Sequence, residues 1–134
     1  MNASQSPELR VFLVDHAIAV RRRIALLVGA IRGVAIVGEA EDSHAAWAHI
    51  SQCRADVVIL DLRLADGGGL DLIGMLSRTT PRVVTIVLTN HSAPAFRAAC
   101  ASAGADYFFD KTTEFDAACH VIDALVRSRR TRRA

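Results

Sequence analysis

Short apolar stretches rich in β-branched residues recur along the chain at a nearly constant spacing. They begin at Val11, Val34, Val57, Val83 and, in a more aromatic form, Tyr107, so successive starts are 23 to 26 residues apart. The stretches VFLV, VAIV, VVIL and VVTIVL do not alternate between apolar and polar residues, which is typical of strands buried on both faces of a parallel sheet. The pattern therefore predicts five parallel strands with helices on both sides.

The segments between these stretches carry apolar residues at the period of an amphipathic helix. The clearest stripes are Val20, Ile24, Leu27 and Ile31; Phe96, Ala99, Cys100 and Ala103; and Phe115, Ala118, Cys119, Ile122 and Leu125. Two less regular helices are marked by Trp47 and Ile50 and by Leu70, Ile73, Met75 and Leu76. Five strand-helix units in this order predict an α/β fold, a doubly wound five-stranded parallel sheet flanked by five helices.

Length and composition fit one globular domain. The chain has 134 residues, of which 51% are hydrophobic and 22% charged, and it holds no apolar run near the roughly 20 residues of a membrane span. The opening lacks the regions of a signal peptide, so we expect a cytoplasmic protein without a membrane partner. We divide it into a disordered or frayed N-terminus (1–8), a folded domain (9–126) and a basic tail (127–134), and we expect no separate catalytic or output domain.

The basic residues are distributed unevenly. Five of the 16 fall in the last eight positions, and all 14 acidic residues precede them, so the body of the chain is mildly acidic. Clustered arginine can contact nucleic-acid phosphates, but this tail has no aromatic residue that could stack on a base. We therefore expect a solvated helix end and no nucleic-acid partner. The three cysteines have no C-x-x-C spacing and are predicted to be small core residues.

Polar side chains follow four of the five predicted strands. Asp15 and His16 follow the first strand, Asp61 the third, Thr89 the fourth and Lys111 the fifth. Parallel strands end at one edge of the sheet, where ligands of doubly wound folds bind. Two carboxylates, a hydroxyl and an ammonium there suit a phosphoryl group and a Mg²⁺ ion. The only lysine of the chain is Lys111, and its compact ammonium suits a single phosphate oxygen.

Four motifs occur in a characteristic order: FLVD, VVILDLRLADGGGLDLI, VVTIVLTN and AGADYFFDK. On these motifs the chain, from Leu9 to Val126, resembles the receiver domain of bacterial two-component response regulators. The resemblance implies a flavodoxin-like fold of five strand-helix units. It also implies that a sensor histidine kinase or a phosphotransfer protein donates a phosphoryl group from a phosphohistidine to an aspartate.

The resemblance implies a role for four residues. Asp61 matches the phosphoacceptor, whose carboxylate is the nucleophile, and Lys111 matches the lysine that pairs with the phosphoryl group. Thr89 matches the switch hydroxyl, and Phe108 matches the switch aromatic residue. Phosphorylation is then expected to draw Thr89 inward and to let Phe108 fill the vacated space, reshaping the surface of the fourth helix and the fifth strand.

The metal site of the family is only partly present. Asp15, Asp61 and the backbone carbonyl of Arg63 match its protein ligands, but His16 stands where the family usually has a second acidic residue. We expect weak Mg²⁺ binding, with Mn²⁺ as a possible substitute, because imidazole is a poor ligand for a hard ion. The Arg63 guanidinium is close enough in sequence to pair with Asp61, and His91 could affect hydrolysis of the phosphate. Alternatively, Arg63 points to solvent and His16 caps the first helix.

Two enzyme classes that share such a sheet are disfavoured. The glycine-rich motifs of NAD-binding and ATP-binding enzymes are absent, and a haloacid-dehalogenase-like phosphatase needs an acidic residue where Arg63 stands. We expect a single-domain response regulator, a monomer or weak homodimer, that is not an enzyme beyond gaining and losing its own phosphoryl group. Its output would be phosphorylation-dependent binding to a downstream protein. The alternative is a receiver-like interaction domain that works without phosphorylation because its metal pocket is altered.

Overall fold

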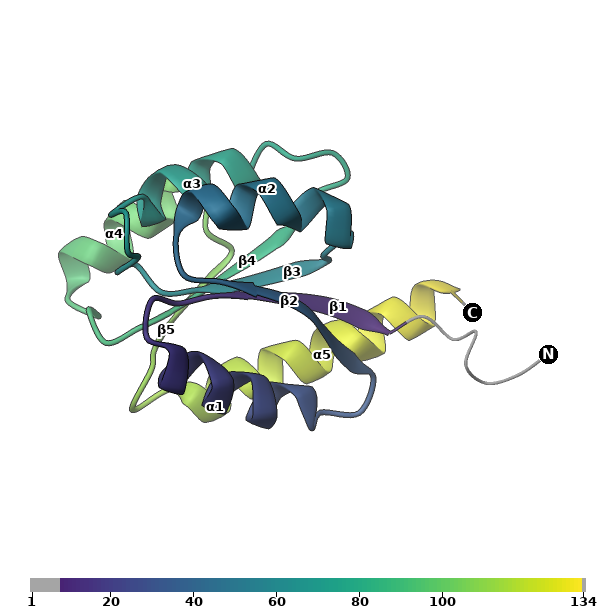
Figure 1. Cartoon of the computed structure of the whole chain (residues 1–134). Coiled ribbons are helices and arrows are strands. Elements are labelled where there is room, and N and C mark those ends of the chain that lie inside the picture. Colours follow the sequence, from purple (N-terminus) through teal and green to yellow (C-terminus); the bar gives the residue numbers. More distant parts are fainter. Residues whose placement is uncertain (1–7, 134) are drawn as a thin grey trace.

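The computed structural model describes residues 8–133, with side chains up to residue 129. Strands and helices alternate along these residues: β1 (Leu9–Val14), α1 (Ile18–Gly29), β2 (Val34–Ala40), α2 (Ser43–Cys53), β3 (Val57–Leu60), α3 (Gly69–Leu76), β4 (Val84–Thr89), α4 (Pro94–Ala103), β5 (Tyr107–Asp110) and α5 (Phe115–Arg133). The strands form one parallel sheet in the order β2-β1-β3-β4-β5. Helices α2, α3 and α4 cover one face, and α1 and α5 cover the other (Figure 1). The predicted doubly wound α/β fold is confirmed.

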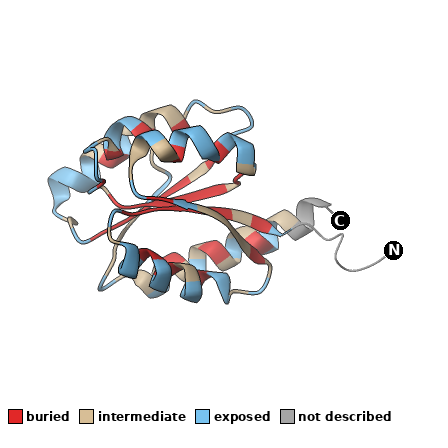
Figure 2. Ribbon diagram, viewed as in Figure 1, coloured by how far each residue is buried: buried red, intermediate tan, exposed pale blue. Residues whose placement is uncertain are grey.

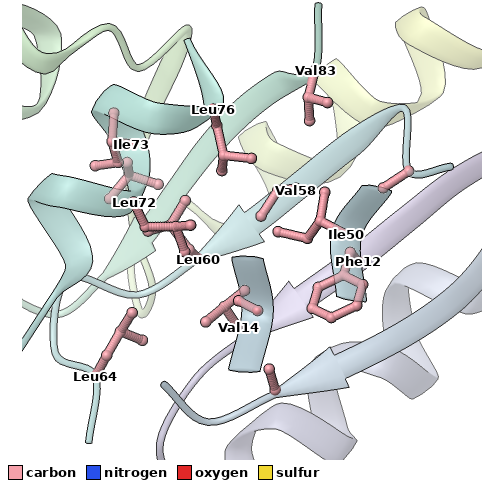
Figure 3. Packing of buried hydrophobic residues seen from close by; sticks show 14 of the residues in the cluster. Phe12, Val14, Ile50, Val58, Leu60, Leu64, Leu72, Ile73, Leu76 and Val83 are labelled. Carbon is pink, nitrogen blue, oxygen red and sulfur yellow. The ribbon is translucent and has the colours of Figure 1, made fainter. Parts of the chain in front are cut away.

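Two apolar clusters hold the helices to the sheet, one on each face. Successive residues of a strand enter opposite clusters: Phe12 and Val14 face α2 and α3, whereas Leu13 faces α1 and α5. The cluster under α2 and α3 is shown in Figure 3. Figure 2 shows the strands as the most continuously buried part of the molecule. Burial on both faces explains why the strand sequences do not alternate in polarity.

Two Ala-Asp dipeptides anchor the amino-terminal edge of the sheet. Ala55-Asp56 precedes β3 and Ala105-Asp106 precedes β5. Asp56 accepts a hydrogen bond from the backbone N–H of Arg10 in β1, and Asp106 accepts one from Thr85 in β4, both at 2.9 Å. Each aspartate thus ties the entry of its own strand to a neighbouring strand.

The predicted buried stripes are wrong in four of the helices. In α1 the buried residues are Arg21, Ile24 and Val28, and Val20 and Leu27 are exposed. The prediction failed there because it treated every arginine as a surface residue, whereas the Arg21 guanidinium reaches hydrogen-bond acceptors below the helix. In each of the other three helices a single stripe residue is exposed. Phe96 in α4, Leu70 in α3 and Trp47 in α2 are exposed to 46%, 44% and 43%.

Helix α5 continues to Arg133 and so includes most of the segment predicted as a basic tail. Arg129 departs from the expected solvated end: its Nη1 lies 3.0 Å from Asp56 Oδ1, and its side chain is 21% exposed. Residues 1–7 of the predicted frayed N-terminus lie outside the described residues, as does Ala134. The remaining division of the chain stays a prediction.

The cysteines of the chain are free thiols. Cys100 is fully buried in the cluster under α3 and α4, as predicted, and burial raises its pKa to about 11. Cys53 and Cys119 are half-buried. Within residues 8–133, the helices lack the length and apolar character needed to cross a bilayer.

Candidate phosphoacceptor site

The strand order brings four of the predicted site residues together. Asp15 follows β1, Asp61 follows β3, Thr89 ends β4, and Lys111 follows β5. Because β3 lies between β1 and β4, Asp61 is placed at the centre of the carboxyl-terminal edge. Asp15, Asp61 and Thr89 are only 3%, 6% and 0% exposed. The edge therefore holds a buried polar cluster within an apolar sheet.

Lys111 bridges the two carboxylates of this cluster. Its Nζ lies 2.8 Å from Asp15 Oδ2 and 2.5 Å from Asp61 Oδ2. The other oxygen of Asp61, Oδ1, accepts hydrogen bonds from Thr89 Oγ1 at 2.7 Å and from the backbone N–H of Arg63 at 3.1 Å. Buried charges are tolerated only when they are paired and hydrogen-bonded, and both Asp61 oxygens meet that condition.

These contacts set the charges of the pair. Burial alone would raise the pKa of Asp61, but hydrogen bonds from Lys111, Thr89 and the Arg63 backbone outweigh it and lower that pKa. Burial alone would lower the pKa of Lys111, but its contacts with Asp15 and Asp61 raise it overall. At neutral pH, Asp61 is therefore a carboxylate and Lys111 an ammonium, the states needed for nucleophilic attack on a phosphoryl group.

Arg21 supports this cluster from below. Its Nη1 donates to the backbone carbonyl of Asp15 at 2.5 Å, and its Nε donates to Glu39 Oε1 at 2.8 Å. The bonds join α1, the end of β1 and the end of β2. This role of Arg21 was not predicted, although Arg21 shares a helix face with Ile24 and Val28, which is a usable signal in the sequence.

The loop after Asp61 is fixed to the start of α2 by a second carboxylate that sequence reasoning missed. Asp66 accepts hydrogen bonds from the Ser43 hydroxyl at 2.6 Å and from the backbone N–H groups of Ser43 and Gly68. The Ser43 hydroxyl is the main reason that the pKa of Asp66 falls to about 2. At the end of the loop, a Cβ on Gly69 would lie 2.6 Å from the Leu62 carbonyl oxygen, so only glycine allows this close approach.

His16 lies beside the backbone carbonyl predicted to bind metal. Its Nδ1 is 3.0 Å from the Arg63 carbonyl oxygen, so the tautomer protonated on Nδ1 donates to it, and 3.9 Å from Asp15 Oδ1. His16 does not cap the first helix: the N-cap is Ala17, whose N–H bonds to Asp15 Oδ1. The suggested salt bridge from the Arg63 side chain to Asp61 is absent from the described residues, since only the Arg63 backbone contacts Asp61.

The oxygen donors beside Asp61 suit a divalent cation only in part. Asp15, Asp61 and the Arg63 carbonyl supply the oxygen donors that Mg²⁺ prefers. Within the described residues, however, no group of three or more His, Cys, Asp or Glu is arranged to hold a metal ion. The donors thus fit Mg²⁺ in kind but provide only two carboxylates.

The predicted switch residues lie beside the cluster. The Thr89 hydroxyl already donates a hydrogen bond to Asp61, so it contacts the acceptor carboxylate without the expected inward movement. Phe108 is half-buried, and Arg97 lies over its ring with the guanidinium carbon 4.6 Å from the ring centroid. His91 donates its backbone N–H to Thr89 Oγ1, and its ring packs edge-on against Phe96 at 5.9 Å.

Comparisons with known proteins agree with this geometry. The family model of the response regulator receiver domain matches residues 11–123. The chain therefore belongs to the response regulator receiver family, whose members accept a phosphoryl group and interact with histidine kinases. Receiver domains of this family are generally not enzymes, and they generally bind Mg²⁺ at the phosphorylation site.

Three similar proteins illustrate the relationship. The DNA-binding transcriptional activator DevR/DosR of Mycobacterium tuberculosis is 38% identical over 63% of this chain and 39% of its own length. The response regulator UvrY of Escherichia coli K12 is 33% identical over 77% of this chain and 47% of its own length. A LuxR-family two-component response regulator from Aurantimonas superposes with a TM-score of 0.82 and 26% identity, over 90% of this chain and 86% of that one. The chain spans less than half the length of these two curated relatives.

Proposed function

We propose that this protein accepts a phosphoryl group on Asp61 from the phosphohistidine of a sensor histidine kinase or a phosphotransfer protein. The observation that carries the proposal is the placement of the ionised Asp61 carboxylate against both Lys111 and Thr89. An Asp61 oxygen attacks phosphorus, the P–N bond to the histidine breaks, and the released imidazole nitrogen takes up a proton. Lys111 and Thr89 then contact the oxygens of the phosphoryl group, where negative charge accumulates.

The proposal includes a weak Mg²⁺ site, which Mn²⁺ can also occupy. Asp15, Asp61 and the Arg63 carbonyl would hold the ion, and the bound cation would offset the charge of the transferring phosphoryl group. The His16 ring already contacts the Arg63 carbonyl, so a hydrogen bond from it would use one of the two lone pairs of this oxygen and leave the other for the ion. Lys111 lies between both carboxylates and supplies part of the positive charge when the ion is absent.

The output of the phosphorylated protein is proposed to be binding to a downstream protein through the surface of α4 and β5. This surface adjoins the switch residues, because Thr89 ends β4 and Phe108 lies in β5. Arg97 of α4 covers the Phe108 ring and also donates to its backbone carbonyl. A change that begins at Asp61 and Thr89 would therefore reach α4 through Phe108 and Arg97.

Phosphotransfer is tested with a small phosphodonor. The parent protein is incubated with phosphoramidate and Mg²⁺ or Mn²⁺, and the intact mass is measured. The parent should gain one phosphoryl group, Asp61→Asn should gain none, and Asp71→Asn, which removes an exposed carboxylate of α3, should behave as the parent does. Equal labelling of Asp61→Asn and the parent would contradict the assignment of the acceptor.

A second function is supported by one specific contact. Because the His16 ring lies at the Arg63 carbonyl, the pocket offers less to a metal than its relatives' pockets do, which favours an interaction domain that works without phosphorylation. Under this alternative, the parent stays unlabelled with either metal, and Asp61→Asn binds the partner as tightly as the parent does. Labelling that alters partner binding would exclude it.

A further inference from the structure

A groove lies at the amino-terminal edge of the sheet, opposite Asp61. It has a volume of about 940 Å³, within the range of small-molecule sites. One wall is formed by Trp47, Ile50 and Ser51 on one face of α2 and by Arg54, the residue that caps the carboxyl end of this helix. The other wall is the segment 79–83 between α3 and β4.

Three arginines and one aspartate line this groove. Arg10 donates to the Cys53 carbonyl through Nε and Nη2, at 2.9 and 2.7 Å, so it is held in place. Arg129 pairs with Asp56 through Nη1, but its buried Nε has no hydrogen-bond partner. Arg54 is exposed, and among the described residues no carboxylate pairs with it. The groove thus has a surplus of positive charge and an unused buried donor.

An exposed aromatic ring shares this groove with the cations. Trp47 is 43% exposed although Ile50, one turn later, is fully buried. A flat, partly exposed indole offers a stacking surface to a nucleobase, and such stacking does not depend on which base is present. Guanidinium groups suit phosphate oxygens, because their N–H groups form a planar fork.

We propose that this groove binds a nucleotide, with its base against Trp47 and its phosphates near Arg54 and Arg129. The chemistry fits both halves of that ligand, because a phosphate alone would leave the indole uncovered and a base alone would leave the cations unpaired. The proposed occupant is a single nucleotide, because the volume of the groove, about 940 Å³, is that of a small-molecule site. The groove does not include Asp61, which lies at the other end of the strands.

Binding can be followed through the fluorescence of Trp47, which is the single tryptophan of the chain. ADP is titrated in EDTA without divalent cations, so that the Asp61 edge does not bind it through a metal. We expect saturable quenching, and calorimetry should give the same dissociation constant. Adenosine and pyrophosphate, which each carry half of the ligand, should bind at least about tenfold more weakly than ADP.

Variants separate the groove from general charge. Arg54→Gln should weaken ADP binding about tenfold, as expected for one lost charge-assisted contact. Arg22→Gln removes an exposed arginine of α1 and should leave binding unchanged, as should Asp61→Asn. The proposal is overturned if ADP gives neither quenching nor heat, if both arginine variants weaken binding equally, if pyrophosphate binds as tightly as ADP, or if a short single-stranded oligonucleotide binds more tightly.

Discussion

The two edges of the sheet both collect ionised side chains, but they balance the charges differently. At the carboxyl-terminal edge, Asp15 and Asp61 share the single ammonium of Lys111, and both are almost fully buried. At the amino-terminal edge, Asp56 is partly exposed and contacts Arg129 and the backbone of Arg10, and one arginine N–H has no partner. One edge has excess carboxylate and the other has excess guanidinium.

Because of this difference, the two edges suit different functions. Buried charges interact strongly because little water screens them, so each group of the Asp61 cluster depends on the others. Such a cluster suits bond making and breaking, where protonation states must be fixed. At the amino-terminal edge, Arg54 is exposed and has no carboxylate partner among the described residues, so its charge is screened by water and remains available to a ligand from solution.

The largest expected effect comes from removing the shared cation. Lys111→Met leaves two buried carboxylates without their ammonium and should lower the free energy of unfolding by about 3–5 kcal/mol. Urea denaturation at pH 7 measures this value. Arg82→Met breaks a largely exposed pair with Asp106 and should cost only about 0–1 kcal/mol. Equal costs in the two variants would mean that the buried cluster is not more strongly coupled than a surface pair.

The free energy of unfolding of Lys111→Met should also depend on pH in a defined direction. In the parent, the pKa of Asp61 is lowered, so its contribution is present above about pH 4 and is lost as pH falls through the folded-state pKa. In Lys111→Met, burial dominates and raises that pKa, so the variant gains stability as pH falls. The difference in unfolding free energy between parent and variant should therefore narrow between pH 7 and pH 5. A constant difference would show that Asp61 keeps a lowered pKa without Lys111.

The next effect concerns metal affinity at the carboxyl-terminal edge. His16→Asp adds an oxygen ligand beside Asp15 and should tighten Mg²⁺ binding about 10- to 100-fold, or roughly 1–3 kcal/mol. Mn²⁺ binding should change less, because imidazole already suits that ion. Calorimetric titration of both metals measures the change, and His120→Asp, on the exposed side of α5, is the control. Tight Mg²⁺ binding by the parent, unchanged in His16→Asp, would place His16 outside the metal shell.

Sequence could predict the carboxyl-terminal edge because its residues follow the strands directly. Asp15, Asp61, Thr89 and Lys111 each stand at or just after a strand end, and parallel strands end together. The contact from His16 to the Arg63 carbonyl was not predictable, because it depends on how one loop passes over another. The chain pattern locates strand ends, but not the paths of loops between them.

The sequence pattern predicted little of the amino-terminal edge of the sheet. Its groove combines the end of α2, the segment before β4 and Arg129 of α5, which no local period connects. Arg129 was assigned to a solvated tail because it lies in an arginine-rich run, yet it returns to Asp56. The basic composition of the run gave no sign of this long-range contact to the start of β3.

The smallest expected effect comes from the aspartate at the amino-terminal edge. Asp56→Asn removes a charge that accepts the Arg10 backbone N–H and pairs with Arg129, but the amide oxygen can still accept one of these bonds. We expect a loss of about 1–2 kcal/mol in unfolding free energy, measured by urea denaturation at pH 7. Asp106→Asn, at the corresponding position before β5, should cost a similar amount because it also accepts a strand N–H and an arginine contact. A loss as large as that of Lys111→Met would show that the two edges are equally coupled, and the contrast between them would then fail.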